Sequence, residues 1–534
     1  MTARRLGVAA ALAAATLLAS CAPPEAGPPG LGERVVVEQG ELHGRTDGDV
    51  LRFRGIPFAA PPVGERRWLA PGPPEPWTGV REATEPGPRC PQGPAPAGAP
   101  HATAGSLEED CLTLDVTVPA GTPGDARLPV LVWLHGGGFS AGSGGDVDPR
   151  RLVRAGPLVA VTLNYRLGAL GFLGLPGLAD SGSFGLLDQQ QALRWVQRNA
   201  AAFGGDPDNV TLAGESAGAD GACAQIAAPA AEGLFRRAVL QSGGCGSANL
   251  TDVIRPGTGP GGDTWKPLEL VESTGVEVAE ELGCPDPGSA AQCLRAAPVE
   301  RLLGTGDTYW SPAVGTPTLP RRPSDLVADG ELRPTPVLAG TTAAEGTLFT
   351  DLFFVRGEGP ITGDRFAELL DDAAGRRAAR ARTAYPTEGR SPGRAWSDVI
   401  TDRGYACPAL DAYRAMGRRA PLFAYEFTDP SAPATFTALP PDLSGAATHG
   451  AEVAYLLDLV PGQPALDPAQ RELADRMVAA WARFATTGDP SPPGGPAWPR
   501  WTGEGQITTL GPGAPAPRTG PEFADAHRCR LWTG

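Results

Sequence analysis

The stretch Val210-Thr-Leu-Ala-Gly-Glu-Ser-Ala-Gly218 is a short apolar run that ends in Gly-x-Ser-x-Gly and leads into an alanine-rich segment. The pattern predicts a strand, a sharp turn and a helix, with Ser216 at the turn. Gly214 and Gly218 would let the strand and the helix approach closely, so that the Ser216 hydroxyl stands clear of the sheet. The same pentad also fits an ordinary turn serine, so its context decides.

Three other segments supply what a nucleophilic serine needs. Residues 129–134 form an apolar run before His135-Gly-Gly-Gly-Phe139, a loop type that offers backbone N–H groups to an oxyanion. Residues 335–340 resemble a second buried strand, and Glu345 follows it closely. His449 comes later, in a Gly- and Ala-rich segment. The order Ser, Glu, His is the one found in α/β-hydrolases.

Elimination favours His449 as the base. The chain has five histidines, His43, His101, His135, His449 and His527. In this fold the base follows both the nucleophile and the acid, which leaves His449 and His527. His527 sits two residues before Cys529, in a tail that is more typical of a tethered end than of a catalytic loop. Asp351 and Asp402 are rival acids, but neither follows a strand end as closely as Glu345, which could itself be a solvated loop carboxylate.

Composition narrows the class of protein. One site has to collect residues 216, 345 and 449 of a 534-residue chain, which favours one large domain over several. The net charge of −15 disfavours nucleic acid as a partner, because phosphate binding requires a basic face. No run reaches the roughly 18 apolar residues that span a bilayer. We find no repeat and no metal-ligand spacing, and we expect no cofactor and no metal.

The N-terminus predicts export. Residues 1–5 are basic and residues 6–20 are apolar, as in a secretory signal peptide. Leu18-Ala-Ser-Cys21 resembles a bacterial lipobox, in which the cysteine becomes lipidated. We therefore expect a signal peptide over 1–20, a lipidated Cys21 with a Pro/Gly-rich tether over 21–33, and the folded domain over 34–534. Membrane contact would be through the lipid only; the alternative is an ordinary signal peptide that happens to end near a cysteine, and a secreted enzyme.

The chain resembles the type-B carboxylesterases, the family of bacterial p-nitrobenzyl esterases, animal carboxylesterases and cholinesterases. The resemblance runs from about residue 35 to the end. Besides the segments quoted above, it rests on Phe53-Arg-Gly-Ile-Pro-Phe-Ala59, Glu109-Asp-Cys-Leu112, Asn164-Tyr-Arg166, Gly185-Leu-Leu-Asp-Gln-Gln-Gln-Ala-Leu-Arg-Trp-Val196, Phe203-Gly-Gly-Asp-Pro207 and Gln241-Ser-Gly243.

The resemblance implies an α/β-hydrolase fold, with a mostly parallel sheet flanked by helices and insertions that build a gorge over the site. It implies acyl-enzyme formation at Ser216, with His449 as base and Glu345 as acid. The oxyanion donors would be the backbone N–H groups of Gly137, Gly138 and Ala217, and the supporting residues would be Glu215, Ser242 and Glu452.

Eight cysteines remain when Cys21 is set aside, and an even number in an exported chain indicates disulfides. The resemblance implies three pairs, Cys90 with Cys111, Cys284 with Cys293, and Cys407 with Cys529. Cys223 and Cys245 are left over, as a fourth pair or as two buried thiols.

Two departures from the family pattern bear on function. Ala219-Asp220-Gly221 stands where relatives carry a small residue, a variable one and a serine, so helix packing behind the turn is expected to differ. The segment from Cys90 to Cys111 contains no Trp, Tyr or Phe, which argues against binding a quaternary ammonium.

The sequence thus predicts a serine carboxyl-ester hydrolase. A lipase or polymer esterase of the same fold is the alternative enzyme, and a non-catalytic adhesion or binding protein is the alternative class. The natural ester and the oligomeric state stay open.

Overall fold

The computed structural model describes residues 30–95, 105–246, 253–254, 264–305, 310–436, 438–460, 462 and 464–532. The predicted signal peptide, Cys21 and most of the predicted tether lie outside the described residues, as does His101.

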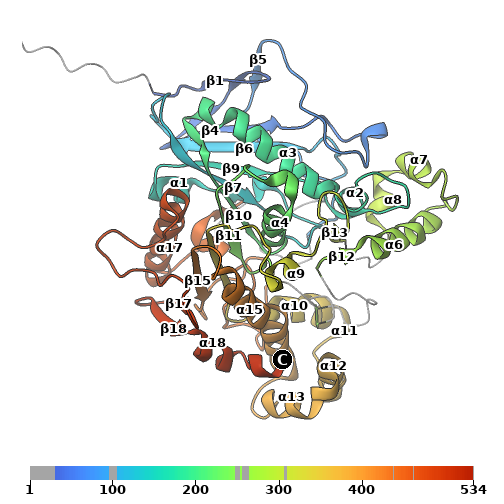
Figure 1. The fold of residues 1–534 in the computed structure, drawn as a ribbon, viewed down its shortest axis with the longest axis vertical. Helices are drawn as coiled ribbons and strands as arrows, with labels where there is room; N and C mark the ends of the chain where they lie inside the picture. The colour runs from blue at the N-terminus through green and yellow to red at the C-terminus, as the bar shows by residue number, and fades with distance from the viewer. Residues whose placement is uncertain are drawn as a thin grey trace, which may run out of the picture.

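A large twisted sheet runs through the molecule (Figure 1). In the described residues it has 11 strands in the order β18-β17-β15-β14-β11-β10-β7-β9-β6-β4-β3. The strands from β9 to β17 pair in parallel, and the two edges are antiparallel. Their bounds are β3 Arg45–Asp47, β4 Val50–Pro57, β6 Thr113–Pro119, β7 Leu128–Leu134, β9 Val159–Leu163, β10 Gly205–Glu215, β11 Arg237–Gln241, β14 Val337–Thr342, β15 Leu422–Phe427, β17 Gln506–Leu510 and β18 Ala516–Thr519.

Helices cover both faces of this sheet, because its central strands are apolar on both sides. In β7, Val132 and Leu134 belong to one core while Leu131 and Trp133 belong to the other, as the two-residue period of a strand requires. The helices α3 (Phe184–Asn199) and α4 (Ala217–Ala227) pack on the first face. The helices α1 (Arg150–Ala155) and α17 (Pro468–Thr487) pack on the second.

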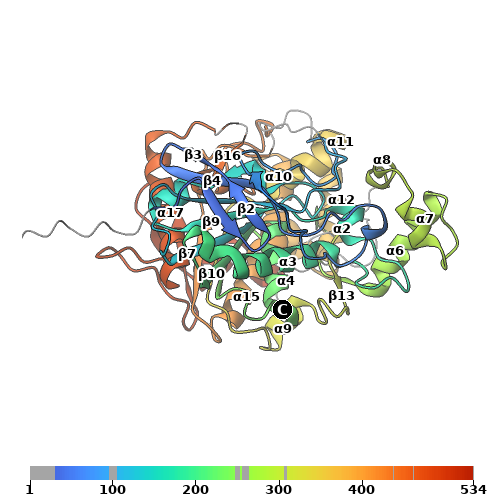
Figure 2. The ribbon, with the colours of Figure 1, turned by 90° about the horizontal axis from the view of Figure 1, so that it is seen from above.

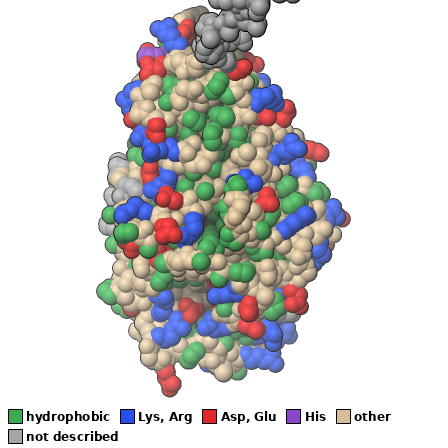
Figure 3. All heavy atoms as spheres, turned by 90° about the vertical axis from the view of Figure 1, so that its left-hand side faces the viewer, with side chains coloured by type: hydrophobic (Ala, Val, Ile, Leu, Met, Phe, Trp, Pro, Cys, Tyr) green, Lys and Arg blue, Asp and Glu red, His purple; other side chains and the backbone are tan. Residues whose placement is uncertain are grey.

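The apolar side chains of the last long helix lie in the core. Leu473, Met477, Trp481 and Phe484 are each at most 1% exposed in α17. On the side of the molecule where α1 and α17 lie, acidic and basic side chains are interspersed (Figure 3). Arg151, for example, pairs with Asp458 at 2.7 Å.

Two groups of helices extend beyond the sheet (Figures 1 and 2). The helices α6 (Leu268–Glu281), α7 (Ala290–Arg295) and α8 (Val299–Leu303) form a lobe at one end. A second group follows β14 and includes α10 (Gly346–Thr350), α12 (Gly363–Ala374), α13 (Ala378–Ala384), α14 (Pro392–Ile400) and α15 (Cys407–Met416). Two π-helical segments, Asp351–Val355 and Thr401–Ala406, interrupt this second group.

Four disulfides join described residues. They link Cys90 to Cys111, Cys223 to Cys245, Cys284 to Cys293 and Cys407 to Cys529. The first, third and fourth are the pairs that the family resemblance implies, and the second joins the two cysteines that were left over. Within the described ranges, no helix is both long enough and apolar enough to cross a membrane.

Candidate active site

Ser216 occupies a sharp turn between β10 and α4. Its backbone has φ 55° and ψ −126°, a conformation that costs a non-glycine residue about 1–3 kcal/mol. The Ser216 N–H donates to the Gln241 carbonyl at 2.8 Å. A Cβ on Gly214 would lie 2.3 Å from the Gly218 carbonyl oxygen, and one on Gly218 would lie 2.1 Å from the Leu134 carbonyl oxygen. The two glycines are therefore required by the close approach of strand, turn and helix.

His449 and Glu345 come together from two loops that follow β14 and β15. The His449 Nδ1 donates to Glu345 Oε2 at 2.5 Å, and both side chains are almost fully buried. The other oxygen of Glu345 accepts the backbone N–H of Thr342 at 2.7 Å, which fixes the carboxylate. A backbone hydrogen bond from Ala344 to Ala447 at 3.0 Å joins the two loops. This arrangement sets the imidazole tautomer and directs Nε2 away from Glu345.

The Nε2 atom of His449 lies beside the turn that carries Ser216. This atom is 3.3 Å from Oε1 of Glu215, the residue that precedes Ser216. Among the described residues, no hydrogen bond joins the Ser216 hydroxyl to His449. Catalytic hydrogen bonds are commonly long in enzymes without substrate and tighten when substrate binds, so the arrangement is compatible with a serine–histidine pair.

Buried carboxylates dominate the electrostatics. Burial alone would lower the pKa of His449, but the charges of Glu345 and Glu215 outweigh it and raise the pKa to about 9. Burial also raises the pKa of Glu215 to about 8 and that of Glu452 to about 7, with further contributions from the neighbouring carboxylates. The site therefore stabilises an imidazolium at His449.

The glycine loop that follows β7, residues 135–139, lies against the Ser216 turn. A Cβ on Gly136 would lie 3.1 Å from the Ser216 Cβ, so the loop backbone directly contacts the serine. Gly137 has φ 103° and Gly138 has φ 62°, conformations that favour glycine. Ala217 is the first residue of α4, so its N–H has no acceptor within that helix. The three expected oxyanion donors thus belong to two segments that meet at Ser216.

His135 has a structural role in this loop. Its ring stacks on Tyr165 with centroids 4.4 Å apart, and the Tyr165 hydroxyl donates to the His135 carbonyl at 2.8 Å. Burial lowers the pKa of His135 to about 4, so it stays neutral.

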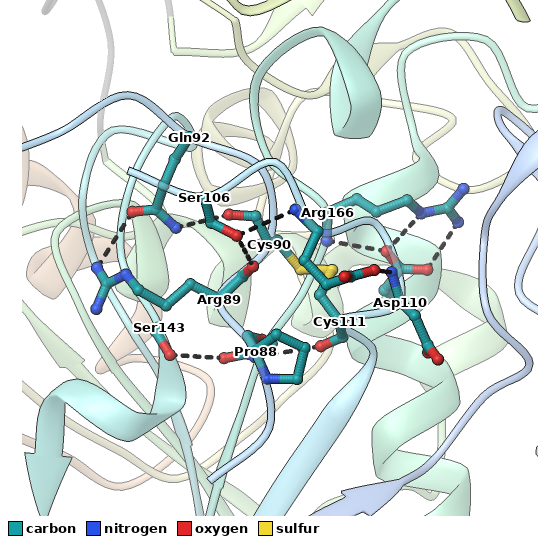
Figure 4. Close-up of a disulfide and its surroundings, with 12 residues drawn as sticks. Pro88, Arg89, Cys90, Gln92, Ser106, Asp110, Cys111, Ser143 and Arg166 are labelled. Carbon is teal, nitrogen blue, oxygen red and sulfur yellow. Dashed lines mark hydrogen bonds and ion pairs between the residues drawn. A yellow bond between two sulfur atoms is a disulfide. The ribbon is translucent and has the colours of Figure 1, made fainter. Parts of the chain in front are cut away.

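No sequence pattern indicated the residue that supports the glycine loop. The side-chain amide of Gln92 donates to the Gly142 carbonyl and accepts the Gly142 N–H, both at 2.9 Å. Gln92 lies two residues past Cys90, and the Cys90–Cys111 disulfide holds this segment in place (Figure 4). A buried amide that pairs with a backbone across 50 residues has no local sequence signature.

Aromatic residues around His449 were also missed. The ring centroids of Phe349 and Tyr405 lie 4.8 and 5.3 Å from that of His449, and the two rings stack on each other. Phe436 is 39% exposed and lies against Gly450. The only local signal was the spacing of Phe349 and Phe353, which places both on one side of a helix.

The hydrogen-bond and ion-pair partners of the remaining candidate residues show which of them belong to the site around His449. The Ser242 hydroxyl donates to Glu452 Oε1 at 3.4 Å, as does the Gln241 amide. The rival acid Asp351 pairs with Arg356 at 2.8 Å, and Asp402 pairs with His527 at 2.8 Å, so neither is the partner of His449. The described residues contain no group of three or more His, Cys, Asp or Glu that could hold a metal ion.

Comparison with known proteins gives a consistent set of relatives. The model of the carboxylesterase family matches residues 32–517. The para-nitrobenzyl esterase of Bacillus subtilis (strain 168) is 34% identical over 86% of this chain and 90% of its own length. The phenmedipham hydrolase of Pseudarthrobacter oxydans is also 34% identical, over 86% of this chain and 91% of its own. The acetylcholinesterase of Bungarus fasciatus is 33% identical, over 88% and 81%.

Among solved structures, one of PNB esterase superposes with a TM-score of 0.75 at 31% identity and covers 94% of this chain and all of that one. The predicted α/β-hydrolase fold is confirmed.

Proposed function

The chain belongs to the carboxylesterase family and hydrolyses ester bonds, and we propose that it does so through an acyl-enzyme on Ser216, with His449 as general base and Glu345 as the acid that orients it. The observation that carries the proposal is the His449–Glu345 hydrogen bond of 2.5 Å, which presents the opposite ring nitrogen to the strained serine turn.

In the first step, Ser216 Oγ bonds to the ester carbonyl carbon and its proton passes to His449 Nε2. The carbonyl oxygen becomes an oxyanion, for which the Gly137, Gly138 and Ala217 N–H groups are the donors. The carbon–oxygen bond to the alcohol then breaks, and the alcohol leaves with the proton from His449. Water then attacks the acyl-enzyme in the same way, with His449 as base. The bond between the acyl group and Ser216 Oγ breaks, the carboxylic acid product departs, and the proton returns to Ser216.

Three buried carboxyl groups favour this chemistry because each stabilises the imidazolium. Glu345 accepts a hydrogen bond from Nδ1, Glu215 lies 3.3 Å from Nε2, and the charge of Glu452 also raises the pKa of His449. Glu452 is in turn held by Ser242 and Gln241.

The test is hydrolysis of p-nitrophenyl esters from acetate to long acyl chains, by a soluble form that starts at Ala22. The Ser216→Ala variant should lose about 10⁴- to 10⁶-fold in kcat with its circular dichroism unchanged. The chain-length profile of the wild type then separates a short-chain esterase from a lipase. A folded wild type no faster than Ser216→Ala would contradict the proposal and favour the non-catalytic class.

We also propose that the enzyme is exported and anchored by a lipid on Cys21. Four disulfides are typical of an exported protein. Expressed from the full chain, the wild type should enter the detergent phase, whereas Cys21→Ala should stay in the aqueous phase with full activity. Equal partitioning of the two proteins would show that Cys21 carries no anchor.

A further inference from the structure

The disulfide that the family resemblance does not imply lies directly behind the serine turn. Cys223 is in the second turn of α4, and Cys245 is in the loop that follows β11. Their side chains are 0% and 2% exposed. Since α4 begins at the residue after Ser216, the disulfide ties the helix of the nucleophile to the segment that carries Ser242.

Asp220 makes a second connection between the same two segments. Its Oδ1 accepts the backbone N–H of Gly244 at 2.7 Å, and Asp220 is 5% exposed. Asp220 and Cys223 are three residues apart in a helix, so both lie on the side of α4 that faces this loop. The unusual Ala219-Asp220-Gly221 sequence therefore has a defined role in the packing behind the turn.

The loop also contacts Ser216 itself. The Gln241 carbonyl accepts the Ser216 N–H, and a Cβ on Gly243 would lie only 2.6 Å from the Ser216 carbonyl oxygen. Residues 241–246 thus touch both sides of the strained peptide unit and are fixed at their far end by Asp220 and the disulfide. Ser242, in the same loop, contacts Glu452.

We propose that Asp220 and the Cys223–Cys245 disulfide form a clamp that positions Ser216 and the Ala217 N–H relative to the carboxylates around His449. The inference rests on the proposed role of Ser216 as nucleophile. A residue in an unfavourable backbone conformation keeps it only when its surroundings over-determine it. Residues 241–246 supply that constraint, and the clamp holds residues 241–246.

The first test compares two substitutions at Asp220. Asp220→Asn keeps an oxygen that can accept the Gly244 N–H, whereas Asp220→Ala removes it. On p-nitrophenyl acetate, Asp220→Ala should lower kcat about 10-fold or more with KM within 3-fold of wild type, and Asp220→Asn should recover most of the loss. Folded Asp220→Ala with wild-type kcat and a lower Tm would overturn the clamp and leave Asp220 a purely structural role.

The second test removes the disulfide and uses another disulfide as its control. Cys223→Ala/Cys245→Ala should lower kcat and the rate of Ser216 labelling by a fluorophosphonate about 10- to 100-fold, because misplacement by about 1 Å has effects of that size. Cys284→Ala/Cys293→Ala removes a disulfide from the lobe of α6 and α7 and should leave both rates within 2-fold. Equal rates in the two double variants would overturn the clamp.

Labelling also distinguishes a failure of the proposed function from a failure of the clamp. If the wild type is labelled at a residue other than Ser216, the proposed function fails, and the clamp fails with it. If Ser216 is labelled equally fast with and without the disulfide, only the clamp fails. Should the double variant not fold, the Asp220 pair decides.

Discussion

Among the described residues, two buried histidines each lie between two carboxyl groups, and one of the two lies beside the turn that carries Ser216. His449 has Glu345 at Nδ1 and Glu215 at Nε2. His527 has Asp402 at Nδ1 and Glu426 at Nε2, both at 2.8 Å. In both cases burial alone would lower the pKa, and the nearby carboxylates raise it to about 9.

The two clusters differ in what surrounds the carboxylates. Around His527, Arg528 pairs with Asp402 at 3.0 Å and Arg518 pairs with Glu426 at 2.8 Å. The Tyr385 hydroxyl also donates to Asp402. In the described part of the chain, no arginine pairs with Glu215, Glu345 or Glu452. The carboxylates around His527 are therefore balanced by fixed cations, whereas those around His449 leave that histidine as the group that takes up a proton.

A histidine–carboxylate pair therefore does not by itself indicate catalysis. Both nitrogens of His527 are held in hydrogen bonds that join the C-terminal segment to the rest of the fold, next to the Cys407–Cys529 disulfide. His449 has one nitrogen held by Glu345 and the other at the serine turn. Function follows from what the second nitrogen faces.

The largest expected difference in kcat is between substitutions of Glu345 and Asp402, the carboxylates at Nδ1 of the two histidines. Glu345→Gln should lower kcat about 10⁴-fold, because the amide no longer selects the correct tautomer of His449. Asp402→Asn should leave the kcat of the folded protein within 3-fold, because its partner is His527. Ester hydrolysis and circular dichroism measure both. A folded Asp402→Asn variant that loses activity would remove the distinction between the clusters.

The next contrast concerns stability and pH. His527→Gln should destabilise the fold by roughly 3–5 kcal/mol at pH 6.5, because it leaves two buried carboxylates without their shared partner. The folded pKa of about 9 exceeds the ordinary value of 6.5, so the contribution of His527 is complete below about pH 6.5 and is lost as pH rises through 9. The difference in Tm between variant and wild type should therefore shrink at pH 9.5.

His43 provides the control for that measurement. It bonds to Glu82 at 2.9 Å in a much more exposed setting, so His43→Gln should change stability by less than about 1 kcal/mol. A His527→Gln variant no less stable than His43→Gln would show that the second cluster does not secure the fold.

A substitution in the glycine loop should change the activation free energy by about as much as His527→Gln changes the free energy of unfolding. Gly137→Ala should lower kcat roughly 10²- to 10³-fold, the usual loss when one oxyanion donor is displaced. Gly137 has φ 103°, and a Cβ there would lie 2.2 Å from the Ala141 carbonyl oxygen. Gly177 is also left-handed, with open space around it, so Gly177→Ala reports the backbone cost alone and should keep kcat. Similar kcat values for the two variants would contradict an oxyanion role.

The smallest expected effect is a shift in the pKa of His449 when the charge of Glu215 is removed. Glu215→Gln removes a negative charge 3.3 Å from His449 Nε2, so the pKa of His449 should fall. The acid limb of the kcat/KM profile should move to lower pH by about one unit. A limb that stays in place would show that Glu215 does not tune the base.

Much of the fold was predictable because the central strands are uninterrupted apolar runs. The predicted strands at 129–134 and 335–340 correspond to Leu128–Leu134 and Val337–Thr342. Local pattern suffices for such elements, since both faces of the sheet are covered.

Contacts between segments that are far apart in the chain could not be predicted from the sequence. Nothing around Gln92 indicates that it pairs with Gly142, and nothing around His527 indicates its place between Asp402 and Glu426. Asp220 was visible only as a departure from a family pattern, without its partner Gly244. The assignment of Ser216, Glu345 and His449 to catalysis came from order along the chain, and it stays a prediction until activity is measured.

Covalent labelling with a fluorophosphonate tests directly whether Ser216 is the nucleophile and His449 its base. The labelled residue is identified by peptide mass spectrometry in the wild type, His449→Ala and His527→Ala. The proposed mechanism predicts that Ser216 alone is labelled, that His449→Ala reduces the rate by at least about 10³-fold, and that folded His527→Ala is labelled within 3-fold of the wild-type rate. Labelling of a different residue, or His449→Ala reacting as fast as the wild type, would contradict it.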